Sequence, residues 1–188
     1  MQKYGADTRE ITNAIMVISE SVDQEQVRGR QSEPFWCQLK QRILYHGVDI
    51  VELANGQMLS PDLEQFIHSM PLTPEAINAP AFKQSYCYEC MKRAYQSIRT
   101  SIQKHDYEAD FNFVIKKWCS MSEKTRSSGL ADVMNTLQVL NSGVVRSVLS
   151  GPSNISPEVF DEGMSVLVDF PISRDSVSGA LSRSSKVF

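Results

Sequence analysis

The spacing of apolar residues constrains this chain most, because from residue 7 to residue 149 they recur every three or four positions. The first run comprises Ile11, Ala14, Ile15, Ile18 and Val22. The next forms a broad stripe over residues 35–54. This period is that of one buried face of an α-helix. The sequence therefore predicts a mainly α fold, with an all-α domain in the form of a helical bundle over residues 1–150.

Proline and glycine mark the ends of several predicted helices. The long helix begins near Pro34 and ends before Gly56, because proline suits the first turn and glycine the left-handed end. Pro61 and Pro74 each predict the start of a short helix. After Pro80 the apolar period predicts one helix reaching residue 102, and a further helix opening at residue 106. The last amphipathic run, over 130–140, follows the polar interruption SEKTRSSG.

One segment near the end of the chain does not fit the helical pattern. Residues 164–170 contain the consecutive apolar residues Val166, Leu167 and Val168, then Asp169, with Pro171 just beyond. Such a run predicts a buried β-strand with sheet neighbours on both sides. We expect residues 151–172 to form a short helix and this strand, and the Ser-rich residues 173–188 to be disordered.

Composition excludes few classes of protein. The net charge of −3 provides no global attraction to nucleic acid or to an anionic membrane. The N-terminal residues lack the basic and apolar regions of a signal peptide, and no apolar run is long enough to span a bilayer. We therefore expect a cytoplasmic protein with reduced thiols.

Motifs for catalysis and cofactor binding are weak in this sequence. No glycine is followed by lysine, so a phosphate-binding P-loop is missing, and no G-x-S-x-G elbow occurs. The strand ending at Asp169 has the pattern of a Walker B strand, but Phe170 and Pro171 stand where a catalytic glutamate would be needed. The sequence predicts no catalysis by this chain and no cofactor.

Cys87 and Cys90 form a lone C-x-x-C pair. Zinc sites need four ligands, and the other two cysteines and the three histidines are scattered. Three residues apart on a helix, both thiols would face the apolar side. The pattern favours two core cysteines over a zinc or redox site.

The segment EKTRSSG, residues 123–129, is the most interesting polar stretch. Lys124 and Arg126 lie beside the hydroxyls of Thr125, Ser127 and Ser128, just before the apolar run of 130–140. Free N–H groups and hydroxyls at a helix start can bind phosphate, so Lys124 and Arg126 are candidate nucleic-acid-binding residues. The alternative is a capping loop in which Ser127 or Ser128 begins the helix and both cations are solvated.

Several segments, taken in order, are similar to a known family. They are EPFWCQLKQRIL (33–44), LSPDLEQFIHSMP (59–71), EKTRSSG (123–129), GVVRSVLSG (143–151), NISPEVFDEG (154–163) and SVLVDFPI (165–172). Their order and spacing resemble the TraG/TraD-like coupling ATPases of bacterial conjugation and type IV secretion. The resemblance covers roughly residues 5–172.

Members of that family are hexameric, membrane-anchored, DNA-translocating ATPases whose RecA-like α/β domain carries an inserted all-α domain. The resemblance implies that residues up to about 149 correspond to the insertion and that SVLVDFP returns to an incomplete RecA-like sheet. The Walker A loop would precede this region and the Walker B strand would follow it, so the resemblance implies a truncated member. Its implied partners are the relaxosome or a secreted substrate protein, with DNA contact through Lys124 and Arg126.

The sequence thus predicts a helical recognition segment of a coupling protein, without catalysis of its own. The alternative is a stand-alone helical adaptor that adds its lone strand to the sheet edge of a partner.

Overall fold

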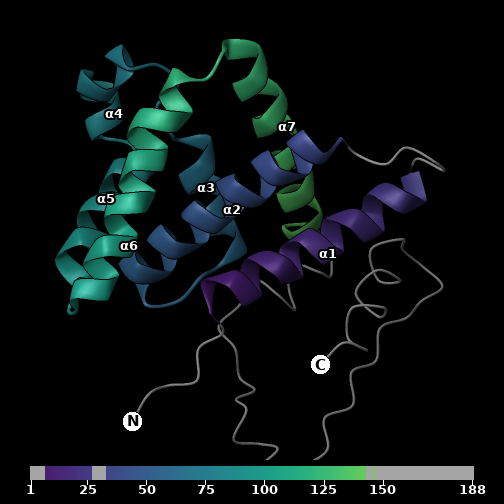
Figure 1. The fold of residues 1–188 in the computed structure, drawn as a ribbon, viewed down its shortest axis with the longest axis horizontal. Coiled ribbons are helices and arrows are strands. Elements are labelled where there is room, and N and C mark those ends of the chain that lie inside the picture. The colour runs from purple at the N-terminus through teal and green to yellow at the C-terminus, as the bar shows by residue number, and fades with distance from the viewer. Residues whose placement is uncertain (1–6, 27–32, 143–145, 147–188) are drawn as a thin grey trace, which may run out of the picture.

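The computed structural model describes residues 7–26, 33–142 and 146. Within these residues the chain forms seven α-helices, one 3-10 helix and one π-helix (Figure 1). In chain order they are α1 (Thr8–Gln26), α2 (Pro34–Asn55), α3 (Ser60–His68), η1 (Glu75–Asn78), α4 (Pro80–Lys83), α5 (Tyr86–Ser97), α6 (Ser101–Asn112), the π-helix η2 (Phe113–Trp118) and α7 (Glu123–Leu140). The predicted mainly α fold is confirmed for this part of the chain.

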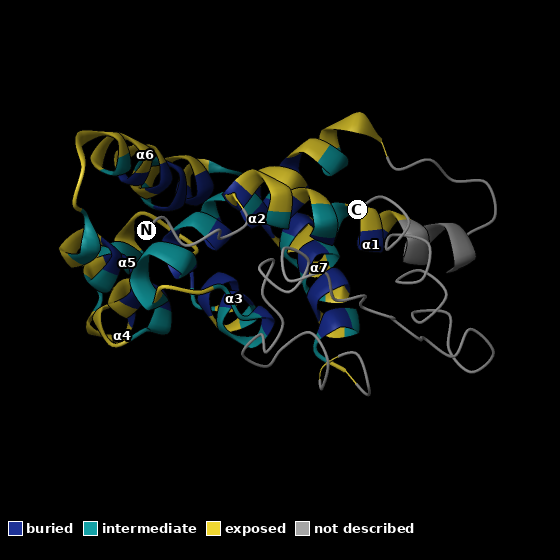
Figure 2. Ribbon diagram, turned by 90° about the horizontal axis from the view of Figure 1, so that it is seen from below, coloured by how far each residue is buried: buried dark blue, intermediate teal, exposed yellow. Residues whose placement is uncertain are grey.

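Helix α2 lies at the centre of the bundle and contacts α1, α3, α5, α6 and α7. Figure 2 shows that α3 and α7 carry their buried faces on the inner side of the bundle. Each Leu, Ile or Val removed from water contributes about 1.5–3 kcal/mol. The wide apolar face of α2 is therefore the main source of cohesion, and its buried residues are Leu39, Lys40, Ile43, Leu44, Gly47, Val48, Ile50 and Val51.

Glycines allow two helices to approach α2 closely and allow α2 to end. A Cβ atom at Gly47 would lie 2.8 Å from Cδ1 of Leu63 in α3. A Cβ at Gly129 in α7 would lie 2.9 Å from Cδ2 of Leu39. Gly56 has a φ of 73° and donates its N–H to the carbonyl of Glu52, which ends α2 where the sequence predicts.

A buried polar network joins α1, α2 and α7. The Nζ atom of Lys40 donates to Oγ of Ser19 at 2.9 Å and pairs with Oδ1 of Asp132 at 2.9 Å. The hydroxyls of Ser19 and Thr136 are 3.0 Å apart. Because Lys40 is only 4% exposed, its charge is stabilised by these partners rather than by water. The network therefore requires specific faces of the three helices to meet.

The prediction of one helix from residue 80 to residue 102 is wrong. Helix α4 is a single turn, and α5 starts anew after Ser85, whose hydroxyl accepts from the N–H of Tyr88. Helix α6 begins at Ser101, not at Asp106, because Thr100 and Gln103 form a capping box. Side chains that satisfy the free N–H groups at a helix start outweigh a continuous apolar period.

Helix α6 continues directly into the π-helix η2. A π-helical turn holds more residues than an α-helical turn, so side chains after it are rotated relative to those before it. Phe113, Val114 and Trp118 of η2 are buried, whereas Phe111 in the last turn of α6 is exposed. Phe111 and Phe113 are two residues apart and therefore point to nearly opposite faces of the helix, Phe113 into the core and Phe111 toward the outer face.

The predicted strand at residues 164–170, and with it the RecA-like sheet, lies outside the described residues. The same holds for the remainder of 151–172 and for the predicted disordered tail at 173–188. No helix among the described residues combines the length and apolarity that crossing a membrane would require.

Candidate functional site

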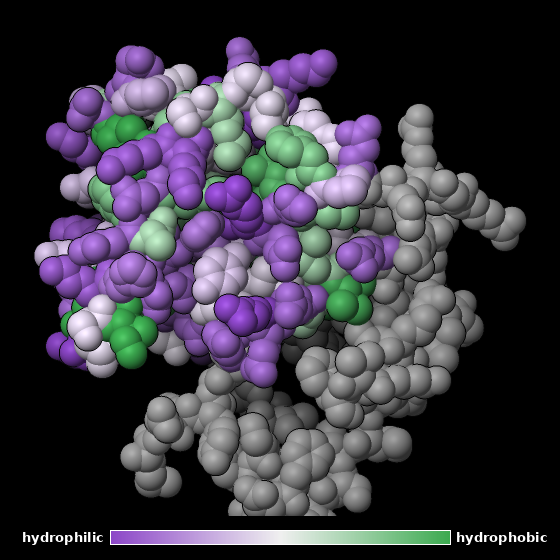
Figure 3. Space-filling view, viewed as in Figure 1, coloured by the Kyte–Doolittle hydropathy of each residue, from purple (hydrophilic) through white to green (hydrophobic). Residues whose placement is uncertain are grey.

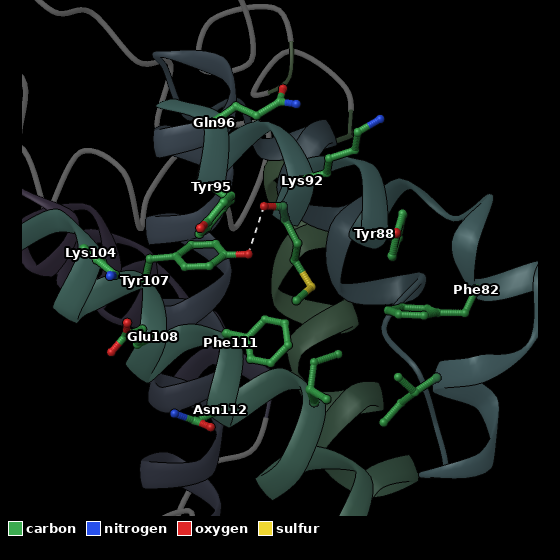
Figure 4. Close-up of a pocket in the computed structure, with 13 residues that line it drawn as sticks. Phe82, Tyr88, Lys92, Tyr95, Gln96, Lys104, Tyr107, Glu108, Phe111 and Asn112 are labelled. Atoms are coloured by element: carbon green, nitrogen blue, oxygen red, sulfur yellow. Dashed lines mark hydrogen bonds between the residues drawn. The ribbon is translucent and has the colours of Figure 1, made fainter. Parts of the chain in front are cut away.

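An apolar groove with a volume of about 640 Å³ lies against α5 and α6. Its floor contains Met91 of α5 and Tyr107 of α6, and Phe82 of α4 lines one end (Figure 4). The hydroxyl of Tyr107 donates to the carbonyl of Met91 at 3.0 Å, which ties α6 to α5 beneath the groove. Burial raises the pKa of Tyr107 to about 12, so this hydroxyl remains a donor at neutral pH.

Partly exposed aromatic rings form the walls of the groove. The ring of Tyr95 lies 5.7 Å from that of Tyr107, which in turn lies 6.3 Å from Phe111. At the other end, Tyr88 meets Phe82 edge to face at 5.7 Å. Tyr95 is 62% exposed, and Tyr88 and Phe111 are each 38% exposed. Exposed aromatic side chains gathered at one concave surface are typical of a binding site.

The surface around the groove is otherwise hydrophilic. On the face of the molecule drawn in Figure 3, most side chains of the described residues are hydrophilic, with separate hydrophobic spots. One large hydrophobic residue beyond the groove is Ile102, which is 72% exposed in the first turn of α6. Four of the seven exposed large hydrophobic side chains among the described residues belong to α5 and α6, and the other three lie elsewhere.

Three charged side chains line the rim of the groove. Lys92 extends from α5, while Lys104 and Glu108 extend from α6 (Figure 4). All three are exposed. Within the described part of the chain, neither lysine has an acidic partner within 4.0 Å. The rim therefore carries one net positive charge, and both ammonium groups are available to a ligand.

A buried acid lies behind the groove, where α6 packs on α2. Oδ1 of Asp110 is 2.7 Å from Nδ1 of His46, and the His46 ring stacks on Phe113 with centroids 4.2 Å apart. Asp110 is 2% exposed, and its Oδ2 has no hydrogen-bond donor. Burial and the adjacent Asp49 raise the pKa of Asp110 to about 9. Burial and Arg42 lower the pKa of His46 to about 4, so both groups are held neutral near pH 7.

The neighbouring cleft between α1, α2 and α6 is acidic. It has a volume of about 740 Å³, and Asp7, Asp49, Glu52 and Asp106 line it together with Arg99. Thr8 donates to Oδ1 of Asp49 at 2.7 Å. Burial and Asp49 raise the pKa of Glu52. This cleft and the aromatic groove differ in character, because one is lined by carboxylates and the other by rings.

The two candidate nucleic-acid-binding residues lie in different environments. Lys124 is exposed, whereas Arg126 is 8% exposed and its Nη1 donates to the carbonyls of Cys119 and Met121. The expected loop before residue 130 is wrong, since α7 begins at Glu123 and its cap is Ser122, which accepts from the N–H of Thr125. Arg126 thus binds the chain segment that precedes its own helix, and the two cations do not form one patch.

Cys87 and Cys90 both lie in the hydrophobic core, as their spacing predicts. Burial raises the pKa of each thiol, so both are kept protonated. Cys87 also contacts the sulfur of Met91 at 3.7 Å. Among the described residues, no three His, Cys, Asp or Glu side chains are placed to hold a metal ion.

Sequence reasoning missed the aromatic groove. A signal was present, because Tyr88 and Tyr95 are seven residues apart on α5, and Tyr107 and Phe111 are four apart on α6. Such spacings place rings on one helix face, but they are also the spacing of core residues. The sequence alone does not distinguish a face packed in the core from one that lines a groove.

Comparison with protein-family models, with curated proteins and with solved structures finds no match to this chain.

Proposed function

We propose that this chain is a protein-recognition domain, whose aromatic groove receives a segment of a partner protein. The groove carries the proposal, because Tyr88, Tyr95 and Phe111 remain partly exposed around a concave apolar surface. Tyrosine and phenylalanine side chains supply large contact area and are enriched at the energetic centres of interfaces. The function is binding rather than catalysis.

We further propose that the domain serves a coupling protein of conjugation or type IV secretion. Support comes from the order of the sequence segments, which resembles that family, and from the helical form of the described residues. The partner would then be a relaxosome component or another secreted substrate protein. Its captured segment would be held in the groove while the rest of the transfer machinery acts on the DNA.

The test is a binding measurement between the purified chain and candidate relaxosome proteins of conjugative systems. Isothermal titration calorimetry should give a saturable complex that a Tyr95→Asp, Phe111→Asp double variant weakens by at least tenfold. Both positions are exposed, so each variant should fold and show an unchanged circular dichroism spectrum. Lys124→Asp is the matched control, since Lys124 is exposed on α7, outside the groove.

Saturable binding that the double variant leaves unchanged would remove the groove from the function. An absence of binding to every relaxosome protein and every secreted substrate protein tested would reject the coupling-protein role.

A further inference from the structure

We infer that the occupant of the groove is an amphipathic α-helix that places carboxylates over Lys92 and Lys104. This inference rests on the proposed recognition function and specifies the chemistry of its partner. It is carried by three observations: the extent of the groove along two helices, its aromatic floor and walls, and the two rim lysines, which have no acidic partner among the residues that the structure describes.

The dimensions of the groove fit a short helix. Its lining extends along α5 from Tyr88 to Gln96, and along α6 and η2 from Lys104 to Ile115. At a rise of about 1.5 Å per residue, the longer bank extends for about 16 Å, or three helical turns. Three turns present anchors at positions i, i+3 or i+4, and i+7, which is how an amphipathic helix occupies an apolar groove.

The charges on the rim of the groove favour acidic residues on either side of the apolar stripe of the ligand helix. Lys92 and Lys104 extend from opposite banks, and Glu108 is the one acidic residue of the lining. Carboxylates on either side of the apolar stripe of a ligand helix would meet these two ammonium groups. Rim charges of this kind contribute to orientation and association rate more than to raw affinity.

The same charges argue against two other occupants. A second copy meeting groove to groove would bring together two rims that each carry one net positive charge, which is unfavourable in a two-fold symmetric contact. Single-stranded nucleic acid stacks on aromatic rings but needs a positive track for its phosphates. Here the track would hold two lysines and one glutamate in a chain of net charge −3.

The experiment is a selection from a displayed library of 16-residue helical peptides, carried out against the full chain. The library fixes apolar residues at i, i+4 and i+7, and each flanking position is Asp, Glu, Lys, Arg, Ser or Gln. We expect enrichment of Asp and Glu at the flanks. A synthetic copy of the most enriched peptide, measured by fluorescence anisotropy, should bind at least tenfold more weakly to a Lys92→Glu, Lys104→Glu double variant.

Charge reversal provides the decisive control. A second peptide with its flanking acids changed to lysine should bind the double variant better than it binds the wild-type chain, whereas Lys124→Glu should leave both affinities unchanged. Equal enrichment of acidic and basic flanks, or an affinity that the reversal does not alter, would overturn the inference. Competition by a 16-nucleotide thymidine strand, lost in Tyr95→Ala, would overturn it in favour of nucleic acid.

These outcomes are separable from failure of the proposed function. If acidic helices bind the groove and no relaxosome or secreted protein does, the coupling-protein role fails and the occupant chemistry stands. If a relaxosome protein binds through Tyr95 and Phe111 without dependence on Lys92 or Lys104, the function stands and the acidic-helix inference fails.

Discussion

Two of the polar contacts that helix α2 makes with its neighbours differ in completeness. Toward its N-terminal end, Lys40 meets both Ser19 of α1 and Asp132 of α7. Toward its middle, His46 meets Asp110 of α6, whose second carboxyl oxygen has no donor. Both contacts involve α2 and a buried ionisable side chain, Lys40 or Asp110, yet only the first pairs a positive charge with a negative one.

The difference lies in what each contact specifies. A compensated buried charge penalises any arrangement that removes its partners, so the Lys40 contact selects the pairing of α1 with α7 across α2. The His46–Asp110 contact holds two neutral groups whose pKa values have moved far from their ordinary values. It therefore makes the packing of α6 sensitive to pH, and α6 is also one bank of the aromatic groove.

The largest expected effect comes from removing the ring that shields His46. Phe113 is 1% exposed and stacks on the imidazole. Phe113→Ala should lower the free energy of unfolding by about 3–5 kcal/mol, because it leaves a cavity in a packed core. The matched control is Phe111→Ala, which truncates a partly exposed ring of the same helical segment and should lower it by less than about 1 kcal/mol.

Urea titration of both variants measures these changes. In Phe113→Ala the pKa of His46, followed by NMR, should also move up toward 6.5 as burial is relieved. Equal destabilisation by the two substitutions would show that Phe113 is not more deeply buried than Phe111.

The next effect is a loss of stability as pH rises, caused by Asp110. The folded pKa of about 9 is above the ordinary value of 3.8, so the folded state retains a proton that the unfolded chain releases between these values. This stabilisation is complete below pH 3.8 and is lost as pH rises to 9. The slope can reach about 1.4 kcal/mol per pH unit.

His46 acts in the opposite direction, because its folded pKa of about 4 is below the ordinary value of 6.5. Its contribution to stability is present above pH 6.5 and is lost as pH falls to 4. Urea midpoints measured from pH 6.5 to 8 therefore report mainly Asp110, because the buried thiols, whose pKa values are also raised, add a loss of stability only nearer pH 9. We expect them to fall in the wild-type chain and to change much less in Asp110→Asn. Glu108→Gln, at an exposed position of the same helix, should keep the wild-type slope, because Glu108 is not among the charges that shift the pKa of Asp110. A slope that survives in Asp110→Asn would assign it to another group.

A smaller effect should follow from breaking the complete contact. Lys40→Met keeps the apolar stem and removes the ammonium, which leaves Ser19 and Asp132 without this partner. Asp132 is 36% exposed at its side chain and can be hydrated, so we expect a loss of about 2 kcal/mol, without pH dependence between 6.5 and 9. Lys124→Met, at an exposed site, should change stability by no more than about 0.5 kcal/mol. A Lys40 variant as stable as the Lys124 variant would remove the network from the energetics of the fold.

The smallest effect tests whether α6 has its own start. Thr100→Ala removes the capping side chain and should cost about 1 kcal/mol, since the N–H of Gln103 loses its acceptor. Amide hydrogen exchange should quicken in the first turn of α6, beside Lys104 of the groove rim. The neighbouring Ser101→Ala is the control and should alter neither quantity. No change in Thr100→Ala would indicate that packing alone sets the start of α6.

The mainly α fold was predictable from the sequence because the apolar period is strong and because proline and glycine mark the ends of helices. Pro34 and Gly56 bound α2 as expected, since each acts through its own backbone geometry. The errors arose where a polar side chain plays a dual role. Ser85 and Thr100 each start a new helix within an apolar period that continues past them in the sequence. Ser122 caps α7 about two turns before the apolar run that begins at Leu130.

The candidate site was harder to predict, because a residue belongs to it only if the rest of the fold leaves its side chain exposed. Tyr95 and Tyr107 have similar sequence surroundings, yet one is largely exposed and the other buried. Arg126 was expected to face a ligand because it lies among hydroxyls, and it instead binds two carbonyls of the preceding turn. Whether a ring or a guanidinium meets solvent depends on the crossing of helices distant in sequence, which a local pattern does not encode.

The Lys40 network also has a consequence for how the chain is made on the ribosome. Lys40 and Asp132 are 92 residues apart (132 minus 40), so the acid is synthesised long after α1 and α2 have left the exit tunnel. Throughout that interval the apolar face of α2 is not yet covered by α7. The ammonium group of Lys40 lies within this face, and water solvates it well. A nascent chain is vulnerable to aggregation through surfaces of this kind. The charge of Lys40 keeps this surface of α2 hydrated until α7 packs against it.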